Sequence, residues 1–156
     1  MYKVKKILAP TDFSDLSKAG IRYALETARE TNAEVVVYHA IDLGNAFQDR
    51  RADFGPHHDM LENSRVVLNR FLTEHFADCI DSVEVRQMVE FGAPHKNIVD
   101  IAASEGMDMI VMSTHGRTGL DHLILGSVAE KVVAHAPCPV LVVPRERRVG
   151  AIGAAA

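Results

Sequence analysis

The chain has 156 residues, of which 47% are hydrophobic and 24% charged, as in an ordinary globular domain, and its formal net charge is −4. It contains no stretch of five like charges, which argues against binding to nucleic acid or to a membrane surface, because both need concentrated basic charge. The apolar run near the N-terminus stops at Pro10, too early for a secretory signal, and no apolar stretch approaches the roughly 20 residues of a membrane span.

Strand and helix patterns alternate along the first half of the chain. Val4–Ala9 reads as a short buried strand, and a helical pattern follows over Ser14–Thr31. Glu34–Ile41 is rich in β-branched residues and apolar on both faces, which is typical of a central strand in a parallel sheet. The polar segment Asp42–Pro56 precedes the next helical pattern, His57–Ala77. We expect this polar segment to be a mobile loop that partly covers a bound ligand.

The second half repeats the alternation. Ser82–Glu90 reads as a strand, and the helix after it begins at Pro94, where the missing N–H of proline costs nothing. Asp108–Met112, Ser127–Ala136 and Pro139–Val143 predict a strand, a helix and a last strand. This order predicts an α/β fold, a single doubly wound domain with a five-stranded parallel sheet and helices on both faces. Ligands of such sheets bind beyond the carboxyl ends of the strands, where the strand order reverses.

The predicted elements form one domain over residues 1–148, which we expect in the cytoplasm, and residues 149–156 are expected to be a flexible tail. The last strand, Pro139–Val143, is strongly apolar. Unpaired, it would be an aggregation-prone edge, so we expect it to pair with its symmetry mate in a homodimer.

The segment from Ser113 to Ser127 holds more glycine and hydroxyl residues than a strand-to-helix connection needs. Glycines allow backbone N–H groups to turn toward an anion, and the N-terminus of the following helix adds unpaired N–H groups. The segment is therefore a candidate phosphate site. Ser127 and Glu130 also fit a capping box, in which Ser127 would serve only its own helix.

Three familiar site patterns are absent from the sequence. There is no G-x-x-x-x-G-K-[ST] for a P-loop, no G-x-G-x-x-G for a dinucleotide and no G-x-S-x-G nucleophile elbow. A hydrolase built on Ser127 is therefore not expected. Nothing near the candidate phosphate site has the pattern of an activated nucleophile or base, so we expect little or no catalysis.

Asp12 follows the first predicted strand at the edge where a ligand should bind. Its carboxylate could accept hydrogen bonds from ribose hydroxyls or help to hold a divalent cation. Alternatively, Asp12 or Ser14 could cap the helix that follows. The two roles of Asp12 are compatible.

The histidines give weaker signals. His57 and His58 are adjacent, so on a helix they point in different directions, and we expect a surface pair rather than a metal site. His39 lies near a strand end and is expected to be a hydrogen-bonded core residue. His115 lies inside the candidate phosphate site and is a possible nucleotide contact.

The segments KKILAPTDFSDLSKAGIRYA, VVVYHAID and FGAPHKNIVD through CPVLVV resemble the universal stress protein family over Lys5–Val143. The resemblance implies a five-stranded parallel sheet and a homodimer formed partly through the last strands. One branch of the family binds ATP or AMP through the pattern G-x2-G-x9-G-[ST]. Here Gly116 is the second glycine and Gly126-Ser127 ends the pattern. Ser113 replaces the first glycine and adds a Cβ where the family's backbone approaches the ribose or phosphates.

By this resemblance, Asp12 would contact the ribose or a nucleotide-bound Mg²⁺, Ala40 and Met112 would border the adenine, and the glycine loop would hold the phosphates. The implied nucleotide contacts are Pro10, Thr11, Asp12, Ala40, Met112, Ser113, His115, Gly116, Arg117, Gly126, Ser127 and Val128. We therefore expect a dimeric, ATP- or AMP-binding stress-response sensor or regulator. The alternatives are a nucleotide-free scaffold for protein partners, which Ser113 favours, and a slow ATPase or autophosphorylating protein.

Overall fold

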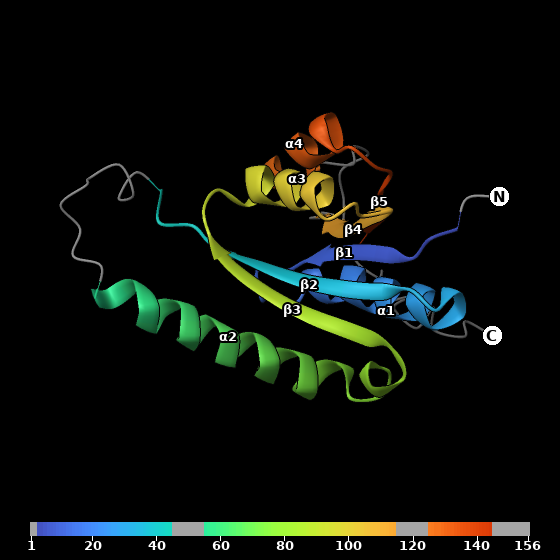
Figure 1. Cartoon of the computed structure of the whole chain (residues 1–156), viewed down its shortest axis with the longest axis horizontal. Helices are drawn as coiled ribbons and strands as arrows, with labels where there is room; N and C mark the ends of the chain where they lie inside the picture. The colour runs from blue at the N-terminus through green and yellow to red at the C-terminus, as the bar shows by residue number, and fades with distance from the viewer. Residues whose placement is uncertain (1–2, 45–54, 115–124, 145–156) are drawn as a thin grey trace, which may run out of the picture.

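Five parallel strands form one sheet in the order β3-β2-β1-β4-β5 (Figure 1). The structure is a computed structural model and describes residues 3–44, 55–114 and 125–144. The strands are β1 (Lys6–Pro10), β2 (Glu34–Ile41), β3 (Glu84–Phe91), β4 (Met109–Thr114) and β5 (Val140–Pro144). The helices are α1 (Ser17–Thr31), α2 (Gly55–Phe76), α3 (Pro94–Ser104) and α4 (Ser127–His135), with a short 3-10 helix, η2 (Ile80–Ser82). The predicted α/β fold with a five-stranded parallel sheet is confirmed.

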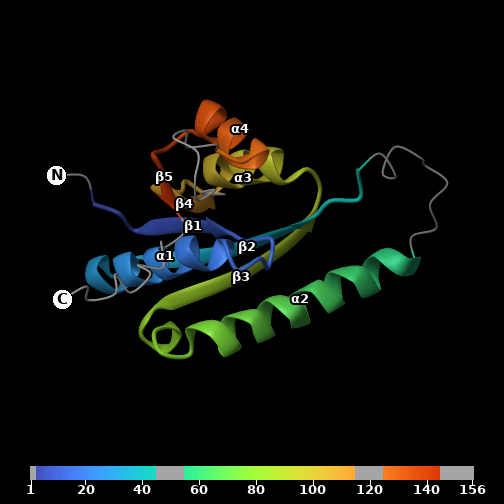
Figure 2. The same cartoon turned by 180° about the vertical axis from the view of Figure 1, so that it is seen from behind.

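Two helices cover each face of the sheet, as the two opposite views show (Figures 1 and 2). Side chains alternate between the faces along each strand. In β1, Ile7 and Ala9 are buried in the core under α1 and α2, whereas Leu8 is buried in the core under α3 and α4. In β2, Val35 and Val36 divide in the same way. This two-sided burial is the reason the middle residues of the central strands are apolar on both faces.

The start of α1 differs from the prediction. The helix begins at Ser17 rather than Ser14, because the residues before it form a separate turn in which the Ser17 N–H donates to Ser14 O at 3.2 Å. The N-cap residue is Leu16, whose own side chain makes no capping hydrogen bond, but Ser14 Oγ accepts from the Ser17 N–H at 3.3 Å. Neither Asp12 nor Ser14 is therefore the N-cap residue, although the Ser14 hydroxyl does accept from the first N–H of the helix. Asp12 Oδ1 instead accepts a hydrogen bond from the Ser14 N–H at 3.0 Å.

Other boundaries also shift. β4 continues to Thr114 and so takes in Ser113, which the sequence pattern left in the loop. α2 begins at Gly55, so the end of the expected loop Asp42–Pro56 is helical. The rest of that loop from residue 45, together with the expected tail at 149–156, lies outside the described residues.

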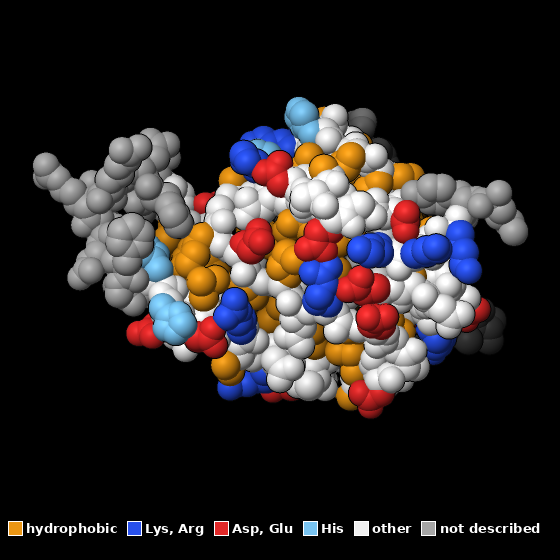
Figure 3. Space-filling model, in the orientation of Figure 1, with side chains coloured by type: hydrophobic (Ala, Val, Ile, Leu, Met, Phe, Trp, Pro, Cys, Tyr) orange, Lys and Arg blue, Asp and Glu red, His pale blue; other side chains and the backbone are white. Residues whose placement is uncertain are grey.

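β5 lies at one edge of the described sheet, paired with β4. Its residues from Val140 to Val143 are half-buried. At the amino end of the strands, Arg86 of β3 pairs with Glu34 at 2.9 Å and with Glu105. Charges of both signs are interspersed on the face shown in Figure 3. No helix in the described ranges is both long enough and apolar enough to cross a bilayer.

Candidate functional site

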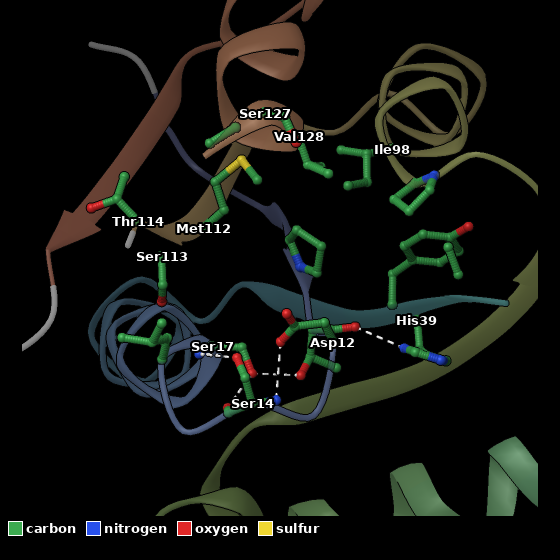
Figure 4. Close-up of a pocket in the computed structure, with 17 residues that line it drawn as sticks. Asp12, Ser14, Ser17, His39, Ile98, Met112, Ser113, Thr114, Ser127 and Val128 are labelled. Carbon is green, nitrogen blue, oxygen red and sulfur yellow. Dashed lines mark hydrogen bonds between the residues drawn. The ribbon is translucent and has the colours of Figure 1, made fainter. Parts of the chain in front are cut away.

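The strand order places β1 beside both β2 and β4. β2 and β3 follow on one side of β1, whereas β4 and β5 follow on the other side. Such a switch point leaves a crevice beyond the carboxyl ends of the central strands. The structure has a cavity of about 190 Å³ there, lined by residues from the ends of β1, β2 and β4 and the starts of α1, α3 and α4 (Figure 4). We refer to it as the β1–β4 cavity.

Most of the predicted site residues that the structure describes line the β1–β4 cavity. They are Pro10, Thr11, Asp12, Ala40, Met112, Ser113, Ser127 and Val128. Gly126 immediately precedes Ser127 but is not among the lining residues. His115, Gly116 and Arg117 lie outside the described residues. The cavity is also lined by residues that the predicted set did not include: Ser14, Leu16, Ser17, Tyr38, His39, Pro94, Ile98, Thr114 and Ala129.

A chain of hydroxyl groups fixes the polar side of the cavity. The Ser17 hydroxyl donates to Ser14 O at 2.8 Å, so it accepts from the Thr11 hydroxyl, which lies 2.7 Å away. Thr11 Oγ1 in turn accepts from the Phe13 N–H at 3.0 Å. These bonds hold the segment between β1 and α1 in one conformation, and Asp12 is exposed on the cavity side of it (Figure 4).

His39 joins β2 to the same segment. Its Nδ1 lies 2.9 Å from Thr11 O, and because a carbonyl oxygen only accepts, Nδ1 carries the proton. The prediction of a hydrogen-bonded His39 is confirmed, although the side chain is half-buried at the cavity rather than deep in the core.

Ser113 points away from the rest of the cavity lining. Its Oγ accepts a hydrogen bond from the Gly20 N–H of α1 at 2.8 Å, and Figure 4 shows the side chain directed at that helix. A Cβ on Gly20 would lie 2.9 Å from this hydroxyl, so the helix can approach β4 this closely only because position 20 is glycine. The side chain that Ser113 has in place of the family's glycine therefore packs between β4 and α1 and is hydrogen-bonded to α1.

The start of α4 also differs from the capping-box interpretation. Gly126 is the N-cap residue, its carbonyl accepts from the Glu130 N–H at 2.9 Å, and no side chain caps the helix. Ser127 lies inside the first turn, so the capping box is wrong, because a serine must stand at the N-cap to form one. The exposed Ser127 side chain and the uncapped N–H groups at this helix end suit an anion.

Thr114 belongs to the candidate phosphate segment, but the predicted nucleotide contacts did not include it, and it lines the cavity. Its side chain is 1% exposed, and its hydroxyl has no hydrogen-bond partner among the described residues. Buried hydroxyl groups normally have a partner, so an unpaired one that lines a cavity marks a position where a ligand can donate or accept. The sequence placed Thr114 in the candidate phosphate segment but did not indicate that its hydroxyl is buried and unpaired.

The opposite side of the cavity is apolar. Ile98, Met112 and Val128 line it together with the ring of Tyr38. Burial raises the pKa of Tyr38 to about 12, and its oxygen accepts a hydrogen bond from Asn97 Nδ2 at 2.9 Å. A flat aromatic ligand group fits such a wall.

Among the residues that the structure describes, no three His, Cys, Asp or Glu side chains gather to hold a metal ion. His58 is exposed on α2, whereas the ring of its neighbour His57 packs edge-on against Phe91 at 5.4 Å. The described lining of the cavity contains neither lysine nor arginine. Asp12 is the one carboxylate among the described lining residues, so it is the charged oxygen ligand that they offer to a cation.

Comparison with known proteins relates the chain to one family. The sequence model of the universal stress protein family matches residues 3–144. Universal stress protein MJ0531 of Methanocaldococcus jannaschii is 34% identical, over 92% of this chain and 84% of the relative. Universal stress protein MJ0577 of the same organism is 32% identical, over 91% of this chain and 96% of the relative.

Solved structures share the fold. The structure of MJ0577 matches with a TM-score of 0.69 at 32% identity, covering 93% of this chain and 99% of that one. A universal stress protein from Archaeoglobus fulgidus, solved in complex with dAMP, matches with a TM-score of 0.62 at 22% identity, covering 92% of this chain and 99% of that one. At that identity the second likeness establishes the fold alone.

Proposed function

Since this chain belongs to the universal stress protein family, we propose that it binds an adenine nucleotide, ATP or AMP, in the β1–β4 cavity. It acts as a stress-response sensor or regulator, with little or no catalysis. One observation carries the proposal. A cavity at the switch point of the sheet joins an apolar wall, an exposed carboxylate and an uncapped helix N-terminus, which are the three features that a nucleotide needs.

Each part of the nucleotide has a place. The base lies against the apolar wall, bordered by Ala40 and Met112, and Asp12 accepts hydrogen bonds from the ribose. The phosphates lie at the start of α4, where Ser127 and the backbone N–H groups meet them. His115, Gly116 and Arg117, outside the described residues, complete the phosphate site in this proposal.

Mg²⁺ enters with the nucleotide. The ion prefers oxygen ligands and is commonly held by one or two carboxylates together with substrate phosphates. Asp12 is a carboxylate at the polar side of the cavity, so it fits this role. The ion would lower the repulsion between the Asp12 carboxylate and a triphosphate.

The protein acts in the cytoplasm as a homodimer in this proposal, without contact to nucleic acid or membrane, and passes the nucleotide signal to protein partners. The half-buried apolar edge strand β5 supports the dimer, because pairing with a second copy would cover it. The earlier argument for a nucleotide-free scaffold, the serine at position 113, loses force because that side chain is directed at α1.

Mass spectrometry of the small molecules that copurify with the natively prepared protein tests the proposal. We expect ATP, ADP or AMP in a fixed ratio to the protein, and titration calorimetry with ATP and Mg²⁺ should show one site per chain. If no adenine nucleotide copurifies and millimolar ATP gives no binding heat at two temperatures, the scaffold interpretation replaces this one.

A further inference from the structure

Phe13 has an unusual backbone conformation. Its φ is 63°, in the left-handed region that bulky side chains rarely adopt. Strained residues of this kind persist only where their surroundings hold them, and they cluster at functional sites. Asp12 and Ser14 on either side line the β1–β4 cavity, whereas Phe13 does not. The strained residue therefore lies behind the site and not in it.

Three contacts hold Phe13 in place. Its N–H donates to Thr11 Oγ1 at 3.0 Å. Its ring stacks on His39 with the ring centres 4.1 Å apart, and it meets Phe71 of α2 edge-on at 5.6 Å. His39 also holds Thr11 O through Nδ1. The Phe13 ring therefore packs between Phe71 of α2 and His39, the side chain that is hydrogen-bonded to the residue after β1.

The conformation of Phe13 determines where Asp12 points. The Asp12 carboxylate accepts from the Ser14 N–H at 3.0 Å, across the residue whose φ is positive. If Phe13 relaxed to an ordinary φ, the Ser14 N–H would turn away and the carboxylate would lose this anchor. A carboxylate has about four acceptor positions, so the bond to Ser14 leaves it able to accept from a ligand.

We infer that Phe13 is a positioning residue. Its ring, which lies between His39 and Phe71, holds the Asp12 carboxylate toward the ribose hydroxyls, so the site prefers nucleotides with both ribose hydroxyls to nucleotides that lack them. The inference rests on the proposed nucleotide site. It assigns sugar selectivity to a side chain that does not line the cavity.

The selectivity has a measurable size. A hydrogen bond to a charged group contributes about 10- to 100-fold in affinity. Wild-type protein should therefore bind AMP about 10- to 100-fold more tightly than 2′,3′-dideoxy-AMP, which lacks both hydroxyls. Loss of the Asp12 orientation weakens the binding of AMP and leaves the affinity for 2′,3′-dideoxy-AMP unchanged. The dissociation constant for the dideoxy compound divided by that for AMP therefore falls.

Titration calorimetry with AMP and 2′,3′-dideoxy-AMP tests this on the full chain. Phe13→Ala removes the ring contacts that hold the positive φ, so residue 13 can relax and the ratio should fall at least about fivefold, toward the value of Asp12→Asn. Phe13→Tyr keeps the ring and should keep the wild-type ratio. Tyr23→Ala removes an exposed aromatic side chain from α1 and is the matched control, again with the wild-type ratio expected.

The outcomes separate the inference from the proposed function. If Phe13→Ala lowers the unfolding temperature and both affinities together but leaves the ratio unchanged, Phe13 is only structural and the inference is overturned. A wild type that binds both compounds equally overturns it too, while adenine binding stands. A wild type that binds neither compound overturns both proposals. If Phe13→Ala does not fold, Phe71→Leu decides in the same way, because Phe71 is outside the cavity lining.

Discussion

Ser113 offers the sharpest test of the geometry at the end of β4. Its hydroxyl accepts from the Gly20 N–H at 2.8 Å. Ser113→Ala removes only this hydroxyl, and a typical hydrogen bond contributes about 0.5–1.5 kcal/mol to the free energy of unfolding. Ser113→Gly also gives the strand a more flexible residue, at a further cost of about 0.5–1 kcal/mol. We therefore expect losses of about 0.5–1.5 kcal/mol for alanine and about 1–2.5 kcal/mol for glycine.

Urea denaturation without ligand, at equal protein concentrations, measures both losses. Ser104→Ala, at an exposed position on α3, is the control and should stay within about 0.5 kcal/mol of the wild type. Because the Ser113 side chain is directed at α1, Ser113→Gly should leave the dissociation constant for ATP within about threefold of wild type, less than the contribution of one hydrogen bond. An unchanged unfolding free energy in Ser113→Ala, or a tenfold gain of ATP affinity in Ser113→Gly, would refute this reasoning.

Four further changes have defined outcomes. Gly126 has φ −57° and ψ 157°, which valine can adopt, so Gly126→Val should fold. It should lack the stabilisation of about 2.7 kcal/mol that ATP at one hundred times its dissociation constant gives the wild type. Thermal unfolding with ATP and Mg²⁺ measures this difference, and equal shifts of the unfolding temperature in both proteins would contradict it. Thr114→Val deletes an unpaired buried hydroxyl, so the unfolding free energy should stay constant or rise by about 1 kcal/mol, and a loss above about 2 kcal/mol in urea denaturation would show that the hydroxyl has a partner. Leu141→Asp puts a charge on the edge strand β5, so the variant should be insoluble or, by light scattering, a monomer. A wild-type protein that is itself monomeric by light scattering rules out the dimer. The folded-state pKa of Tyr38 is raised to about 12, above its unfolded pKa of about 10. Its contribution to the free energy of unfolding is therefore complete below about pH 10 and is lost as the pH rises to about 12. Tyr38→Phe should lack this part of the pH dependence when denaturation is measured from about pH 9 to 12.

The sequence alone was sufficient for the order of the elements and the class of the fold. The β-branched, mostly apolar pattern of Glu34–Ile41 predicted a central parallel strand, and β2 has those bounds with apolar residues buried on both faces. Periodicity predicts these elements because it shows which side chains are buried. Buried side chains recur at every second residue in a strand covered on one face and at every third or fourth residue in a helix. The same reasoning predicted a site beyond the carboxyl ends of the parallel strands, and the β1–β4 cavity lies there.

Side-chain direction at the candidate site needed the tertiary structure. Ser113 looked like an obstruction in the loop, but it bonds to Gly20, which is 93 residues away in sequence. Ser127 fitted a local capping pattern, yet the backbone makes Gly126 the N-cap residue. Nothing near Phe13 in the sequence indicates its left-handed backbone, which depends on rings contributed by β2 and α2. For Ser113 and Phe13 the conformation is set by contacts between segments that are distant in the chain, and these contacts exist only once the sheet and its helices have packed.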